Sequence, residues 1–311
     1  MTTNDSILVL GAGELGMSVL RHLAKRTSQS SKTTISVLLR SATINSDQTE
    51  KRRDVDELRS RNVGVLPGDL SAASPEELSA LVAPFHTVIS CTGFVGGAGT
   101  QRKIAQAVLA AGVRRFVPWQ FGVDYDLIGR GSAQDLFDEQ LDVRDLLRSQ
   151  QATEWVIIST GMFTSFLFEP SFGVVDLHAN EVHALGSFET AVTVTGAEDI
   201  GALTADIVFA DPRIVDRVVY TAGDTITYGH LADLLDSSLG LKLHRSEWSL
   251  THLREELAHD PQNAIKKYRV VFAEGKGVFW PLSQTFNAQN GIATQNVADW
   301  LSSHRKKLTC S

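Results

Sequence analysis

Three glycines near the N-terminus have the spacing of a phosphate-binding turn. Gly11, Gly13 and Gly16 come directly after an apolar run and open a segment with helical periodicity. At these places a glycine permits a tight turn, leaves room for a diphosphate and lets the helix pack against the strand. The free N–H groups of the helix would face that diphosphate. The turn predicts dinucleotide binding by Gly11, Ala12, Gly13, Glu14, Leu15 and Gly16, and a glycine-rich turn without a ligand is the alternative.

The residue after the second predicted strand decides which dinucleotide fits. NAD-binding sites place Asp or Glu there for the ribose 2′-hydroxyl. This sequence has Arg40 followed by Ser41. A guanidinium can hold a 2′-phosphate through charge-assisted hydrogen bonds, and the Ser41 hydroxyl can add another. The pair favours NADP(H), and a surface arginine that ends the strand is the alternative.

Two further strand ends are expected to complete this site. Asp69 and Leu70 follow the third predicted strand, where a side chain and an N–H group could bracket an adenine. Thr92, Gly93 and Phe94 follow the fourth, where Gly93 allows close approach and Phe94 could cover the ribose or nicotinamide. In a parallel sheet the carboxyl ends of the strands form the ligand edge.

Apolar runs and helical periodicity alternate regularly over the first half of the chain. The predicted strands are 7–10, 34–39, 63–66, 87–91, 115–118 and 155–159. The predicted helices between them are 14–27, 51–61, 75–83, 99–111 and 132–150. This order predicts an α/β fold with a doubly wound parallel sheet, an NAD(P)-binding Rossmann fold.

The regular alternation of predicted strands and helices ends near residue 160. We expect a loop-rich insertion over 163–195, short strands at 218–221 and 241–244, and four helices. Those helices are 197–209, 228–238, 249–258 and 294–307. The predicted domains are an NADP-binding domain over 1–160 and a smaller α/β substrate lobe over 161–311, which is interleaved with the sheet if a later strand returns to it.

Composition and charge argue against a nucleic-acid partner. The 311 residues are 43% hydrophobic and 21% charged, with a net charge of −7. No long basic run occurs, and the short run Lys51 to Arg53 has acidic neighbours and is interpreted as a solvated helix start. Binding to nucleic acid needs clustered Lys and Arg, so no nucleic-acid partner is expected. Oligomeric state is not indicated.

The cysteines and the apolar segments point to a reducing, aqueous compartment. Cys91 and Cys310 are the only cysteines, too few for a disulfide framework or a thiolate zinc cluster. No apolar stretch approaches the roughly 20 residues that span a bilayer, and the first residues lack a secretion-signal pattern. We expect a cytoplasmic protein without a membrane partner.

With these residues placed, the chain resembles the isoflavone reductase-like, NmrA-like group of atypical short-chain dehydrogenases. The most specific match is 115–124, Arg-Phe-Val-Pro-Trp-Gln-Phe-Gly-Val-Asp, which is similar to the family segment Arg-Phe-x-Pro-Ser-Glu-Phe-Gly-x-Asp. The match is good over 5–165, and 136–148 and 155–169 are most similar to fungal members. The resemblance implies an NADPH-dependent reductase of secondary metabolism, although some members bind the dinucleotide without turnover.

The resemblance also implies roles for single residues. Gln101, Phe121 and Gly122 are expected along the nicotinamide half of the cofactor. It implies that Asp124, Met162 and Phe163 border the substrate, and we add Trp119, Gln120, Tyr125 and Phe166 as further candidates for substrate contact. No metal site is expected, since the nine histidines lack ligand spacing.

The chain departs from the family at the position of a lysine. Gln140 stands there, and Trp119 and Gln120 replace the family Ser-Glu pair. A glutamine amide can orient a substrate by donating a hydrogen bond, but it cannot deliver a proton at neutral pH. The Tyr-x-x-x-Lys signature of typical short-chain dehydrogenases is missing too. Asp124, Tyr125 and two histidines, His178 and His183, are candidate substitutes, and each also has a purely structural interpretation.

Four phenylalanines fall within residues 162–172. They could line an apolar pocket for a hydrophobic or aromatic substrate, joined by Trp119 and Trp280, or they could only fill the core. Three hypotheses follow for function. The first is an NADPH-dependent reductase of such a molecule, with Gln140 orienting the acceptor. The others are a non-redox enzyme that keeps NADP(H) bound, such as an isomerase, and a non-catalytic NADP(H) sensor with a protein partner.

Overall fold

The computed structural model describes residues 5–28 and 32–309, which form two compact units. The first unit comprises Met1–Gln120, Glu139–Ile158 and Ile200–Val219. The second unit comprises Phe121–Asp138, Ser159–Asp199 and Tyr220–Ser311. The chain therefore crosses between the units several times. The division into independent domains at residue 160 stays a prediction.

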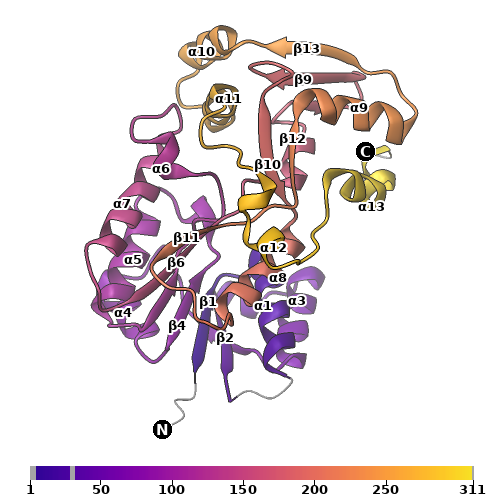
Figure 1. Cartoon of the computed structure of the whole chain (residues 1–311). Coiled ribbons are helices and arrows are strands. Elements are labelled where there is room, and N and C mark those ends of the chain that lie inside the picture. The colour runs from indigo at the N-terminus through magenta and orange to yellow at the C-terminus, as the bar shows by residue number, and fades with distance from the viewer. Residues whose placement is uncertain (1–4, 29–31, 310–311) are drawn as a thin grey trace. The chain divides into compact units, whose positions relative to one another are not determined.

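A seven-stranded sheet forms the centre of the first unit (Figure 1). Its strands are β1 (Ser6–Leu10), β2 (Thr34–Leu39), β3 (Gly64–Pro67), β4 (Thr87–Ser90), β5 (Arg115–Val117), β6 (Glu154–Ser159) and β11 (Arg217–Tyr220). The strand order is β11-β6-β5-β4-β1-β2-β3, and all neighbouring strands from β3 to β6 pair in parallel. The predicted doubly wound sheet is confirmed, and so is the return of a later strand, since β11 pairs with β6.

Helices cover both faces of this sheet (Figure 1). They are α1 (Glu14–Thr27), α2 (Ser41–Ile44), α3 (Thr49–Ser60), α4 (Pro75–Val82), α5 (Thr100–Ala110), α7 (Leu136–Arg148) and α8 (Ala197–Val208), with the short 3-10 helix η1 (Gly93–Gly96). On one face, apolar residues of α4, α5 and α7 pack on alternate strand residues such as Leu8, Val88 and Ile157. On the other face α1 contacts α3 and α8 through the ion pairs Arg21–Glu57 and Arg26–Asp206.

Helix boundaries in the first unit follow local signals. The predicted start of α4 is confirmed: Ser74 and Glu77 form a capping box, in which each side chain bonds the other's backbone N–H, and Pro75 follows at the first helical position. The predicted exposed start of α3 is also confirmed, because Lys51, Arg52 and Arg53 all face solvent.

The second unit contains two small sheets and several helices. Its strands are β7 (Met162–Phe163), β8 (Val175–Asp176), β9 (Glu181–Leu185), β10 (Ala191–Thr195), β12 (Asp224–Thr227) and β13 (His244–Trp248). They pair in the orders β12-β10-β7 and β13-β9-β8. Its helices are α6 (Tyr125–Ile128), α9 (Tyr228–Leu239), α10 (Leu250–His259), α11 (Ala264–Glu274), α12 (Phe286–Gln289) and α13 (Val297–Thr309), with the 3-10 helices η2 (Thr164–Phe168) and η3 (Leu282–Gln284).

Two predictions for this unit are wrong, and one helix was missed. Residues 163–195 are not mainly loop, because β9 and β10 are buried strands of the two small sheets. The strand predicted at 241–244 lies instead at 244–248, where it pairs with β9. Helix α11 was not predicted at all. Among the described residues, no helix combines the length and apolar character needed to cross a membrane.

Candidate functional site

A cavity of about 330 Å³ lies at the carboxyl ends of β1, β2, β3 and β4 in the first unit. It is lined by Gly11, Ala12, Gly13, Leu38, Leu39, Arg40, Thr43, Gly68, Asp69, Leu70, Ser71, Cys91, Thr92 and Gly96. Loops after four separate strands converge here, as expected at the ligand edge of a doubly wound sheet. The cavity thus brings together seven of the sixteen residues that the sequence assigns to the dinucleotide, namely Gly11, Ala12, Gly13, Arg40, Asp69, Leu70 and Thr92.

The three spaced glycines of the first turn meet different constraints. Gly11 has φ of 93°, a conformation that glycine adopts far more easily than other residues. A Cβ atom at Gly16 would overlap the carbonyl oxygen of Gly11, so the bare backbone lets α1 pack against the end of β1. A Cβ atom at Gly13 would meet nothing within 4 Å, so this position borders open space.

The N-terminus of α1 is left open by the protein, unlike that of α5. Gly13 is the N-cap of α1, and no side chain caps the helix. At α5 the carboxylate of Glu139 accepts hydrogen bonds from the backbone N–H groups of Gly99, Gln101 and Arg102, at 2.7, 2.7 and 3.1 Å. Since helix N-termini attract anions, α1 offers an anion site beside the cavity, whereas α5 is already occupied by Glu139.

Arg40 contributes a cation to the same cavity. Its side chain is exposed, and it makes no hydrogen bond or ion pair with any described residue. A neighbouring cavity of about 250 Å³ shares Ala12, Leu39 and Thr43 with the first and adds Lys51, together with the acidic residues Glu50 and Asp54. Two cations therefore flank the end of β2, of which the sequence analysis had singled out only Arg40. Ser41 is the first residue of α2 and is exposed, but it does not line the cavity.

The loop after β3 is held by the side chain of Asp69, which is part of the loop. The carboxylate of Asp69 accepts hydrogen bonds from the N–H and hydroxyl of Ser71, at 2.9 and 2.5 Å, and from the N–H of Ala72. These bonds from Ser71 lower the pKa of Asp69. Leu70 lines the cavity and packs into the core under it. Asp69 therefore shapes the cavity wall chiefly by ordering this turn.

The loop after β4 is fastened at both ends. The hydroxyl of Thr92 donates to the carbonyl of Leu10 at 3.0 Å, and the side-chain amide of Gln101 donates to the carbonyl of Gly93. The predicted residues Thr92, Gly93 and Gln101 thus lie together. Gly93 has φ of 62°, and a Cβ atom there would press on the ring of Trp119. In α1, Leu15 is buried and Glu14 is exposed. Phe94 is half-buried in η1.

Gln140 is fully buried in α7 and bonded to a second predicted residue. The side-chain amide of Gln120 donates to the Oε1 of Gln140 at 2.8 Å and to its backbone carbonyl at 2.9 Å. The Nε of Arg144, which is also buried, donates to the Oε1 of Gln120 at 2.8 Å. The sequence places Gln120 beside the substrate, but in the structure its amide is engaged by these two residues of α7.

Several residues predicted near the nicotinamide or the substrate belong to the second unit. The carbonyl of Gly122, next to the buried Phe121, accepts hydrogen bonds from the N–H groups of Thr160 and Gly161. The carboxylate of Asp124 caps α6 by accepting the N–H of Leu127 at 3.2 Å, and it also accepts the hydroxyl of Tyr220 at 2.8 Å.

Two tyrosines lie close to this group, and one was missed by sequence reasoning. Tyr125 is buried, and its ring packs edge-on against Phe137 at 4.9 Å. Tyr220, which no motif singled out, packs edge-on against Trp280 at 5.0 Å while it holds Asp124. Trp280 itself is buried and donates through its indole N–H to the carbonyl of Thr221.

The aromatic segment 162–172 divides between core and surface. Phe172 is buried within an aromatic cluster of the second unit, and the buried Phe168 stacks on Trp300 at 4.5 Å. Phe163 and Phe166 are half-exposed, and Phe166 contacts the rings of Phe172 and Tyr268. Met162 is buried in β7. Only Phe163 and Phe166 of this set therefore retain exposed ring surface.

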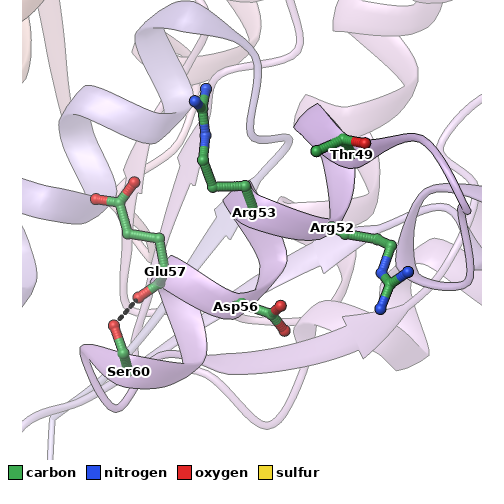
Figure 2. Close-up of a pocket in the computed structure, with 6 residues that line it drawn as sticks. All are labelled: Thr49, Arg52, Arg53, Asp56, Glu57 and Ser60. Atoms are coloured by element: carbon green, nitrogen blue, oxygen red, sulfur yellow. Dashed lines mark hydrogen bonds between the residues drawn. The ribbon is translucent and has the colours of Figure 1, made fainter.

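A larger and shallower hollow of about 510 Å³ lies along one face of α3 (Figure 2). All six lining residues come from that single helix: Thr49, Arg52, Arg53, Asp56, Glu57 and Ser60. The Glu57 carboxylate is already engaged by Arg21 and Arg61, at 2.8 and 3.0 Å, and these arginines lower its pKa to about 2. A solvated helix face of this kind is a weaker candidate than the cavity where four strands end.

The histidines and carboxylates do not suggest a metal site. Within residues 5–28 and 32–309, no cluster of three or more His, Cys, Asp or Glu side chains has the arrangement of a metal site. The Nε2 of His183 lies 3.3 Å from the Oε2 of Glu181, and the His183 ring packs on that of Trp248. His178 lies in a surface turn after β8. The cavity in the first unit is therefore the candidate site.

Known proteins resemble the chain over nearly its whole length. The profile of the NmrA-like family matches residues 3–293. An NmrA-like family domain-containing oxidoreductase of Gibberella moniliformis is 46% identical over 300 residues, which are 96% of this chain and 97% of that protein.

Solved structures share the fold at lower identity. A crystal structure of an isoflavone reductase has a TM-score of 0.78 at 19% identity, over 97% of this chain and 99% of the other. A leucoanthocyanidin reductase–NADPH complex from Vitis vinifera has a TM-score of 0.77 at 16% identity, over 96% of this chain and 99% of the other. Family profile and fungal relative agree, and the chain belongs to the NmrA-like family.

Proposed function

We propose that the protein is an NADPH-dependent reductase of a hydrophobic or aromatic small molecule. The observation that carries this proposal is the cavity at the ends of β1 to β4, which joins an uncapped helix N-terminus to an uncommitted guanidinium. The first suits a diphosphate and the second suits a 2′-phosphate. The names of relatives support it, since the fungal relative is called an oxidoreductase and one structural neighbour is an NADPH complex.

The residues of the cavity fit such a cofactor at each of its charged groups. Gly13 leaves open space where a diphosphate would approach the N–H groups of α1. Arg40 and Lys51 would hold the 2′-phosphate, because both cations lie where β2 ends. A carboxylate in place of Arg40 would repel that phosphate, so the site favours NADP(H) over NAD(H). When bound, a reduced nicotinamide supplies a hydride for an electron-poor carbon of the substrate.

Gln140 would act on the substrate as a hydrogen-bond donor. Its amide can polarise an oxygen or nitrogen atom of the acceptor, which makes the neighbouring carbon more electron-poor. It keeps its protons at neutral pH, so the proton that balances hydride addition comes from solvent. In sum, acceptor, NADPH and one proton give reduced product and NADP⁺.

Some of the residues that the sequence analysis expects beside the substrate suit a hydrophobic or aromatic molecule. Phe163 and Phe166 keep exposed ring surface for a flat, apolar molecule. Asp124, held by Tyr220, offers a fixed acceptor for a substrate hydroxyl. Met162, Tyr125 and Trp119 are proposed to border the substrate as well.

One observation favours a second candidate function. Gln140 cannot donate a proton, and this fits an enzyme that keeps NADP(H) bound and rearranges its substrate without net oxidation or reduction. Such an enzyme would use the same cavity for the cofactor. The two candidates differ in whether NADPH is consumed.

A single assay separates the two candidates. The purified protein is incubated with NADPH and, in separate reactions, chalcone, acetophenone and dihydroisoquinoline, while the absorbance of reduced nicotinamide and the products are followed. Consumption of NADPH with a reduced product supports the reductase. A rearranged product at constant NADPH supports the second candidate. Tight NADPH binding without turnover of any probe would contradict the proposal of a reductase for these aromatic acceptors.

A further inference from the structure

A row of three buried polar side chains runs through the first unit. Gln140 and Arg144 lie four residues apart on one face of α7, and Gln120 follows β5. None of the three has solvent-exposed surface. Hydrogen bonds of 2.8 Å join the Nε of Arg144 to the Oε1 of Gln120, and the Nε2 of Gln120 to the Oε1 of Gln140.

The chemistry of Arg144 fixes the direction of every bond in this row. A guanidinium has only donors, so Gln120 must turn its Oε1 toward Arg144. Its Nε2 then faces α7, where it donates to both the backbone carbonyl and the Oε1 of Gln140. The Oε1 of Gln140 is thereby turned toward Gln120. An amide that could otherwise rotate by half a turn is left in one orientation.

This orientation leaves the Nε2 of Gln140 as a donor. Among the described residues, that buried nitrogen has no hydrogen-bond partner. Buried donors without a partner are rare and costly in folded proteins, so they call for an explanation. A ligand with an acceptor atom would satisfy it.

We propose that Arg144 and Gln120 are positioning residues, which hold the amide of Gln140 so that it presents a donor to an acceptor atom of the substrate. The inference rests on the proposed function and narrows the substrate class. The molecule must carry a carbonyl, imine or similar acceptor at this point, and a substrate with only a donor there is rejected. The substrates are also limited to molecules that can be reduced without a proton from Gln140.

The variant Gln120→Glu is expected to reverse the direction of the hydrogen bond to Gln140 while it keeps a polar side chain at position 120. The new carboxylate still accepts from Arg144, which also balances its charge, but it can no longer donate to the backbone carbonyl of Gln140, so urea unfolding is used first to establish that the variant is folded. A carboxylate has no donor for Gln140, and it accepts from the Nε2 instead. The Gln140 amide then rotates and presents its oxygen. We expect kcat/KM to fall by at least about tenfold for the probe that the wild type reduces fastest, with NADPH affinity unchanged.

Two variants of Gln140 and one control sharpen the test. A carboxyl group donates only when protonated, so the ratio of Gln140→Glu to wild-type kcat/KM is expected to rise as the pH falls. Gln140→Lys combined with Gln120→Glu restores a donor next to the carboxylate and is expected to recover activity lost by Gln120→Glu alone. The control is Gln106→Glu on α5, since Gln106 is exposed and lies outside the row.

Orientation is measured separately by nuclear magnetic resonance of the side-chain amides. In Gln120→Glu the amide protons of Gln140 gain an acceptor, so their resonances are expected to shift downfield, and Gln106→Glu leaves them in place. Unchanged resonances, or a Gln120→Glu variant with wild-type kcat/KM, would overturn the inference. If the wild type consumes no NADPH, the proposed reductase function fails, and the amide shifts still decide the orientation.

Discussion

Changing each of two glycines of the same turn to alanine is expected to affect different properties: NADPH affinity at Gly13 and stability at Gly16. At Gly13 a Cβ atom meets nothing within 4 Å, and the residue has φ of −75°, which alanine adopts without strain. The free energy of unfolding of Gly13→Ala is therefore expected to change by less than about 1 kcal/mol, the balance of a poorer N-cap and a less flexible unfolded chain. The open space at Gly13 is where we place the diphosphate of NADPH.

A methyl group in that space displaces the ligand. Crowding by one extra methyl group costs about 1–3 kcal/mol in a packed site. Since about 1.4 kcal/mol corresponds to a factor of ten, the Kd for NADPH is expected to rise roughly 5- to 150-fold. Gly16→Ala is the matched variant: its Cβ overlaps the backbone of Gly11, so α1 must move and stability falls by about 1–3 kcal/mol.

Urea unfolding and calorimetric titration with NADPH measure the two effects on the same samples. Gly13→Ala should keep the unfolding midpoint and lose affinity, whereas Gly16→Ala should unfold at lower urea. If Gly13→Ala binds NADPH as tightly as the wild type, the diphosphate does not lie against this residue, and the placement of the cofactor is refuted.

Three further predictions concern charged side chains of the first unit. Arg40→Gln should weaken NADPH about tenfold and leave NADH unchanged, and equal losses for both cofactors in titrations would contradict the 2′-phosphate assignment. Glu139→Ala removes the cap of α5 and should lower the unfolding free energy by about 1–2 kcal/mol in urea, whereas a full-stability variant would show that the cap is dispensable. Because Arg21 and Arg61 lower the pKa of Glu57 from 4.5 to about 2, its ion pairs stabilise the protein fully above about pH 4.5 and are lost as the pH falls toward 2. Unfolding free energies across this range should thus depend on pH less in Glu57→Gln, by under about 1 kcal/mol at this surface position, and identical profiles would contradict the assignment.

The parts of the fold that could be predicted are those written in short stretches of sequence. Strands such as β1 and β2 are buried on both faces and appear as continuous apolar runs. The capping residues of α4 and the glycine turn before α1 are equally local. The strands β9 and β10 were missed although β9 also pairs with the nearby two-residue strand β8, since their longer pairings, with β13 and β12, join segments far apart in the chain. Helix α11 was missed although Asn263 and Gly275, a cap at each end, mark its limits.

In the candidate site, too, features set by neighbouring residues could be predicted, whereas contacts between distant segments could not. The glycine turn and Arg40 were identified because each follows a strand directly, where the position itself indicates a ligand. Lys51 was assigned only to a solvated helix, since its place beside the end of β2 depends on how α3 packs. The bonds from Glu139 to α5 and from Gln120 to Gln140 join segments that are distant in sequence. No spacing rule indicates such contacts, so they became visible only in three dimensions.

The central claim is that the N-terminus of α1 binds the diphosphate of NADPH. Amide proton–nitrogen correlation spectra of isotope-labelled protein test it residue by residue during a titration with NADPH. We expect saturable shifts of the backbone amides of Gly13, Glu14 and Leu15, with much smaller shifts at the capped start of α5. Saturation with these three amides unmoved, or no binding of NADPH at all, would contradict the account.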